Sequence, residues 1–181
     1  MSALAIIFLI CACLGGGYLV LAPFRSDLTI SKLEKAALSF AIGFGVIGWL
    51  FFWLAAVGHL SAGITLTMCA MLSLGLFFAD PLKFRFTVPP STMEKMLILS
   101  LCVVFSLDFV EALAPPVEAD TLAYHFELPR RFIEQSKLFF IPRALDGAVP
   151  LLVQMTYVAA LLVSDNAERI LTLWAFISGW G

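Results

Sequence analysis

The chain has 181 residues, of which 61% are hydrophobic and only 13% are charged. About a quarter of the residues of a soluble domain are charged, so this composition excludes an ordinary soluble protein and indicates a lipid bilayer as the solvent. The formal net charge of −2 says nothing about a nucleic-acid partner, and the chain contains no basic run that would suggest one.

Apolar stretches along the chain predict membrane-spanning helices, because about 20 helical residues cross the hydrocarbon core of a bilayer. The stretch at the N-terminus lacks the positively charged region of a cleaved signal peptide, so we expect it to be retained. The last stretch stops at the end of the chain, so we expect an N-terminal fragment that is inactive alone. The predicted spans are 3–22, 36–57, 62–78, 96–114, 150–163 and 170–181.

The charges between these spans predict an orientation. Three basic residues lie in the loop 23–35 and three in the loop 80–95, whereas the turn 58–61 contains no lysine or arginine. Loops rich in lysine and arginine stay in the cytoplasm. The N-terminus, the turn 58–61 and the loop 115–149 are therefore predicted to be extracytoplasmic, although four basic residues in the last loop pull the other way. The predicted fold is all-α, a polytopic transmembrane helical bundle.

Several features inside the spans are interpreted as packing. Trp49 and Trp53 lie one turn apart near the outer end of the second span, where an aromatic belt is usual. The glycine triplet 15–17 lies within a span and lacks the lysine of a phosphate loop, so we assign it no nucleotide. Other glycines are expected to let neighbouring helices approach closely. These are Gly43, Gly45 and Gly48.

The loop 115–149 is the most charged part of the chain, and it begins with two carboxylates, Glu118 and Asp120. The prolines before them favour an extended backbone, in which residues i and i+2 point the same way. The two carboxylates are therefore expected to aim at one point. There they could hold a divalent cation, or one could act as a general base while the other shapes its pKa. Alternatively, Asp120 serves only as the N-cap of the helix that follows.

From Thr121 onward, apolar residues recur at three- and four-residue spacing, which predicts a short amphipathic helix. A helix of this kind beside a span is expected to lie along the membrane surface with its apolar face in lipid. Pro129 is expected to kink or split it after Leu128.

Four further side chains of this segment are candidate site residues. Tyr124 and His125 fall on its polar side, where a lone histidine is commonly a surface hydrogen-bonding group. Arg130 and Arg131 could clamp a phosphate through their forked donors, contact lipid headgroups, or be solvated.

The stretch ALAPPVEADTLAYHFELPRRFIEQSKLFFIP, followed by VPLLVQMTYVAALLV, resembles bacterial membrane glycosyltransferases of the GT-C superfamily. These enzymes are relatives of the dolichyl-phosphate-mannose–protein mannosyltransferases and of the aminoarabinose transferases. The resemblance consists of a Pro-Pro turn, an acidic pair, the run Asp-x-Leu-x-Tyr-His, and Pro-Arg soon after. The residues that carry it are Pro115, Pro116, Glu118, Asp120, Leu122, Tyr124, His125, Pro129 and Arg130.

The resemblance implies a multi-pass enzyme of the plasma (inner) membrane with its active site on the outer face. The donor would be a sugar carried on a polyprenyl phosphate, and the acceptor a lipid, a glycan or a protein. Asp120 would be the catalytic base with Glu118 as its partner, and the same pair could hold Mg²⁺ or Mn²⁺. The residues that would bind the substrates are Tyr124, His125, Arg130 and Arg131.

Two other functions are compatible with a chain as hydrophobic as this one. A transporter or flippase for a lipid-linked or small substrate is expected to place charges near the bilayer midplane and often contains internal repeats. The sequence shows neither feature. A non-catalytic membrane subunit that scaffolds partner proteins is the other alternative.

Overall fold

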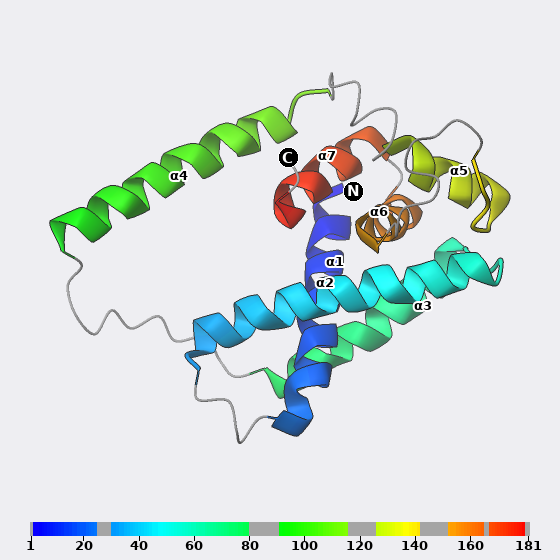
Figure 1. Ribbon diagram of the computed structural model, residues 1–181, viewed down its shortest axis with the longest axis horizontal. Coiled ribbons are helices and arrows are strands. Elements are labelled where there is room, and N and C mark those ends of the chain that lie inside the picture. Colours follow the sequence, from blue (N-terminus) through cyan, green and yellow to red (C-terminus); the bar gives the residue numbers. More distant parts are fainter. Residues whose placement is uncertain are drawn as a thin grey trace.

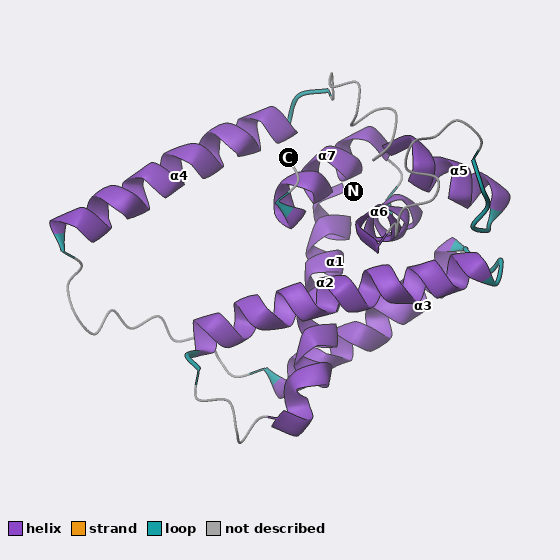
Figure 2. Cartoon of the chain, viewed as in Figure 1, coloured by secondary structure: helices purple, strands orange, loops and turns teal. Residues whose placement is uncertain are grey.

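The computed structural model describes residues 2–24, 30–79, 91–115, 126–141, 152–164 and 167–179. All regular elements within these ranges are helical, which confirms the predicted all-α class for the described part of the chain (Figures 1 and 2). In chain order the elements are α1 Ser2–Leu21, η1 Ala22–Phe24, α2 Lys32–Ala56, α3 Ala62–Ser73, η2 Leu74–Phe78, α4 Thr92–Ala112, α5 Glu127–Gln135, α6 Leu152–Leu162 and α7 Ala167–Ser178, where η marks a 3-10 helix.

Two helical segments of the described chain, Ala3–Phe24 and Lys32–Ala56, are long and apolar enough to cross a membrane. Buried core helices and signal sequences can share this length and composition. α4 is 21 residues long but carries charged residues near both ends. The remaining apolar helices are shorter, so the multi-pass arrangement is taken up below as a proposal.

Capping boxes begin two of the long helices. At the start of α4, the backbone N–H of Glu94 donates to Ser91 Oγ (3.3 Å), and the backbone N–H of Ser91 donates to Glu94 Oε2 (2.7 Å). The hydrogen bond from the Ser91 backbone, supported by the Ser91 side chain, holds the pKa of Glu94 below its ordinary value. Ser31 and Glu34 form the same pair before α2. Because a capping box satisfies the first free N–H groups, α2 begins four residues before the predicted span 36–57.

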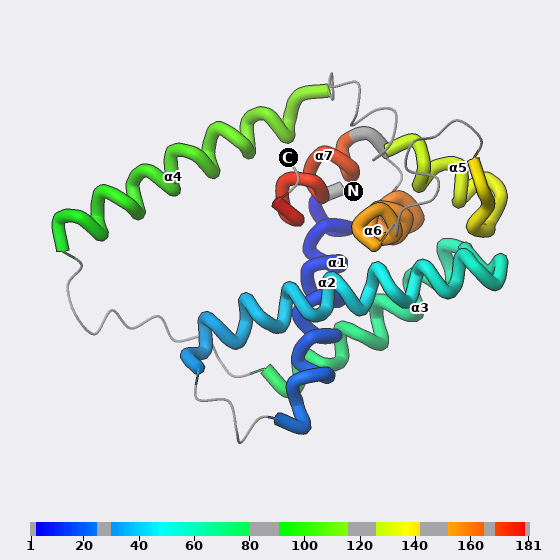
Figure 3. The backbone as a smooth tube through the Cα atoms, in the orientation of Figure 1, coloured from blue at the N-terminus to red at the C-terminus, as the bar shows by residue number. Residues whose placement is uncertain are grey.

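α1 is the central helix, and it crosses α2 with backbone against backbone (Figure 3). A Cβ atom added to Gly17 would collide with the backbone of Ser39, and one added to Gly43 would collide with the backbone of Cys13. Cys13 and Gly17 lie four residues apart on α1, and Ser39 and Gly43 lie four residues apart on α2. Each of these two pairs therefore lies on one face of its helix. The crossing therefore has the close, small-residue packing that is common between membrane helices.

Other glycines mark where further elements touch. A Cβ atom on Gly75 of η2 would strike the carbonyl of Gly15, and one on Gly48 would strike the carbonyl of Leu152 at the start of α6. Nothing in the described structure lies within 4 Å of a Cβ atom placed on Gly45. The prediction of close approach is thus confirmed for Gly43 and Gly48 and wrong for Gly45.

A buried hydrogen bond joins α6 to α7. The indole Nε1 of Trp174 donates to Thr156 Oγ1 (3.0 Å), and that hydroxyl donates to the carbonyl of Val153 (2.7 Å). The indole also stacks on Phe44 of α2, with ring centroids 6.0 Å apart. Trp174 therefore connects three helices through one side chain.

Replacing Thr156 with valine is expected to lower the free energy of unfolding by about 1–2 kcal/mol, because the buried indole N–H loses its acceptor. Unfolding in detergent, followed by tryptophan fluorescence, would measure the loss. The matched control is Trp174→Phe alone and combined with Thr156→Val. If the losses of unfolding free energy in the two single variants sum to the loss in the double variant, the hydrogen bond contributes nothing to stability.

Candidate functional site

The candidate site falls partly outside the described residues, which stop at Pro115 and resume at Phe126. The predictions for the common aim of the two carboxylates, for the N-cap and for cation binding stay predictions. Arg130 and Arg131 are described, and both lie on α5. The candidate residues outside the description are Glu118, Asp120, Tyr124 and His125.

α5 is a short helix within the predicted loop 115–149, and it runs unbroken from Glu127 to Gln135. Pro129 is its third residue, a position where the backbone N–H would have no partner within the helix. The predicted break after Leu128 is therefore wrong. Ser136 ends the helix in the left-handed conformation (φ 52°), and its N–H donates to the carbonyl of Ile133 (3.0 Å).

The apolar face of α5 is buried against protein. Phe126, Leu128 and Phe132 are each at most 3% exposed, and the ring of Phe126 lies 5.8 Å from that of Tyr157 on α6. The amphipathic pattern is confirmed, but the prediction that this face lies in lipid is wrong. The reason is that α6 packs against this face, and an amphipathic pattern does not distinguish a protein neighbour from lipid.

A strap, residues 136–141, follows α5 and fastens it to the end of α2. The N–H of Leu138 donates to the carbonyl of Ala55 (2.8 Å), and the N–H of Leu60 donates to the carbonyl of Ser136 (3.4 Å). The turn between α2 and α3 and the helix α5 consequently lie at one end of the molecule (Figure 1). The strap could not be predicted from the sequence, because backbone hydrogen bonds of this kind leave no pattern in side-chain identity.

The two arginines of α5 differ in their surroundings. Arg131 Nε donates to Glu127 Oε1 at 2.9 Å, with the two side chains 47% and 40% exposed. An exposed pair of this type contributes only about 0.3–0.5 kcal/mol to stability. Arg130 is half-buried and has no charged partner within the described residues. Arg130 is therefore the guanidinium of this helix that is more available to an anion.

The metal prediction also falls outside the described chain. Within the described ranges, no three His, Cys, Asp or Glu side chains gather in a group that could hold a metal ion. Glu127, the described carboxylate nearest to Asp120 in sequence, forms an ion pair with Arg131. The binding of Mg²⁺ or Mn²⁺ by Glu118 and Asp120 therefore stays a prediction.

Comparisons with known proteins found no relative. The chain matches no protein-family model, and no significant match to a curated protein or to a solved structure was found. The resemblance to GT-C glycosyltransferases therefore rests on sequence motifs, chiefly those of the stretch 112–163.

Proposed function

We propose that the chain is part of a membrane glycosyltransferase of the GT-C type. It would move a sugar from a polyprenyl phosphate to a lipid, glycan or protein acceptor at the outer face of the plasma membrane. The observation that carries the proposal is the sequence of the stretch 115–131, in which Pro-Pro, Glu118 and Asp120 precede α5. The buried face of α5 and the strap support it, because they give the end of this acidic segment a fixed attachment.

The exposure of large apolar side chains supports a multi-pass protein. α4 stands apart from the other helices and contacts them mainly at α7, where the rings of Phe109 and Phe176 lie 5.6 Å apart (Figure 1). Leu99 of α4 is 66% exposed, and Phe77 of η2 is 85% exposed. Large apolar side chains that are exposed to this degree are unfavourable in water and ordinary in lipid. We therefore propose that α4 and the shorter apolar helices lie in the bilayer together with α1 and α2.

The proposed reaction is a displacement at the anomeric carbon of the sugar. The acceptor hydroxyl forms a bond to that carbon, the bond from the carbon to the phosphate oxygen breaks, and polyprenyl phosphate leaves. Asp120 takes the proton of the acceptor hydroxyl, with Glu118 beside it. Arg130 stabilises the charge of the departing phosphate, since Arg131 is already paired with Glu127. Mg²⁺ or Mn²⁺ bound by Glu118 and Asp120 would supply the same stabilisation.

The proposal is tested with the complete protein reconstituted in vesicles that contain polyprenyl-phosphate-linked sugars. We expect polyprenyl phosphate to be released in proportion to glycosylated acceptor. Movement of an intact labelled donor between leaflets, without release of polyprenyl phosphate, would instead identify a flippase. Neither release nor movement with any donor of this class would favour a non-catalytic subunit.

A further inference from the structure

The strap holds one aromatic ring outward in a fixed position. Phe140 is 70% exposed, whereas Ile141 beside it is only 4% exposed. On the other side, the ring of Phe139 packs edge-to-face on Phe132, with centroids 5.8 Å apart, and the N–H of Leu138 is bonded to α2. The neighbours of Phe140 are thus attached to protein on both sides, so its exposure does not come from a loose loop.

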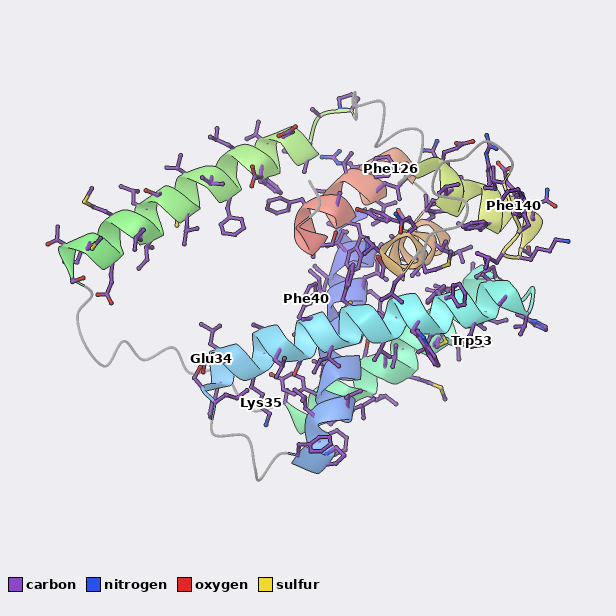
Figure 4. All side chains as sticks on the ribbon, in the orientation of Figure 1. Glu34, Lys35, Phe40, Trp53, Phe126 and Phe140 are labelled. Atoms are coloured by element: carbon purple, nitrogen blue, oxygen red, sulfur yellow. The ribbon has the colours of Figure 1, made fainter. Side chains whose placement is uncertain are left out.

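The end of α2 beside the strap presents further aromatic surface. Trp49 and Trp53 are 58% and 51% exposed, and their rings pack edge-to-face at 5.7 Å. Figure 4 shows Trp53 and Phe140 toward the same end of the molecule, with Glu34 and Lys35 at the opposite end of α2. Lys137 of the strap lies beside the α2–α3 turn, where its Cβ would be 3.9 Å from a Cβ atom on Gly58.

We propose that the strap and the C-terminal end of α2 form an interfacial anchor that binds anionic lipid headgroups. Trp53 and Phe140 enter the headgroup region, and Lys137 contacts a negatively charged lipid. Tryptophan favours this layer of the bilayer, and phenylalanine is common on the apolar face of interfacial segments. A lysine can lay its aliphatic stem along apolar surface while its ammonium stays in water. Lipid is the expected partner of this surface for two reasons. The surface lies at the end of α2, a helix long and apolar enough to cross a membrane, and Lys137 places a cation there.

This anchor is independent of the proposed sugar transfer, since it concerns only how the chain meets the bilayer. Its apolar part also differs from the apolar face of α5, which protein already covers. The anchor would set the depth at which α5 lies, because the strap joins both to the end of α2.

The anchor is tested by placing a photo-crosslinking phenylalanine analogue at position 140, and separately at 53, in the complete protein. The protein is reconstituted in vesicles with equal amounts of an anionic and a zwitterionic lipid. We expect the analogue to crosslink to lipid at both positions. At position 140 it should crosslink to the anionic lipid more than to the zwitterionic lipid. The same analogue at Glu134, an exposed position on the polar side of α5, is the matched control and should give little lipid crosslink.

A second substitution tests the headgroup contact. Lys137→Gln is expected to lower the preference for the anionic lipid at position 140 about fivefold, the factor expected for one lysine near an anionic surface. Lys137→Arg should retain the preference. An unchanged preference in Lys137→Gln would overturn the headgroup contact. Crosslinking of position 140 to a protein, or to nothing while position 53 reaches lipid, would overturn the anchor.

Discussion

Asp120→Asn is expected to lower sugar transfer by the complete protein about 10²–10⁴-fold, the contribution usual for a positioned general base. The amide cannot accept the proton of the acceptor hydroxyl, although it has nearly the same shape as the carboxylate. The KM for the polyprenyl-linked donor should change little if Asp120 acts mainly on the proton. Initial rates of polyprenyl phosphate release, measured over a range of donor concentrations, would separate kcat from KM.

The same substitution distinguishes catalysis from helix capping. Asparagine and aspartate are about equally good N-caps, whereas alanine costs about 1 kcal/mol at that position. Asp120→Asn should therefore leave the Tm unchanged while transfer falls. Asp120→Ala is the matched comparison, and it should lower both. Full transfer by Asp120→Asn together with a lower Tm for Asp120→Ala would reduce Asp120 to a structural cap.

Gly43→Ala and Gly45→Ala are expected to change stability in opposite directions, although the two glycines lie in the same helix. A Cβ atom at position 43 meets the backbone of Cys13, which cannot rotate away as a side chain could. Overpacking of this kind costs about 1–3 kcal/mol. At position 45 the space is open, so alanine should stabilise the helix by about 0.5–1 kcal/mol through its higher helix propensity.

The two glycine variants are compared by thermal unfolding in one detergent, with size-exclusion chromatography before and after heating. Gly17→Ala should resemble Gly43→Ala, because it meets the backbone of Ser39 at the same crossing. Equal Tm values for the variants at 43 and 45 would show that α1 and α2 do not cross with their backbones in contact.

The helices were predictable from the sequence, but their neighbours were not. Long apolar runs identify α1 and α2, since few other patterns place so many uncharged residues together. The exact starts depend on capping, as Ser31 and Glu34 show at α2. Close packing at Gly43 and open space at Gly45 look alike in sequence, because a glycine does not reveal what lies beside it. For the same reason, the apolar side of α5 could not be assigned to protein instead of lipid.

The candidate site was predictable only as a set of residue types. The acidic pair and the arginines are evident in the sequence, but the difference between Arg130 and Arg131 depends on which of them reaches Glu127. Glutamate four residues before arginine is a favourable spacing on a helix, so that ion pair had a signal in the sequence. The strap had none, and it is the strap that connects α5 to α2.

Because of that connection, α5 is expected to move together with the end of α2. The link is made through backbone atoms, from Leu138 N–H to the carbonyl of Ala55, so it does not depend on which side chains stand there. Spanning helices tilt when the bilayer becomes thinner or thicker than their apolar length. If α2 spans the membrane, any such tilt carries α5 with it, and Arg130 moves relative to a phosphate held at the headgroup level. A change in membrane thickness would then shift Arg130 at the candidate site through the backbone link between the strap and α2.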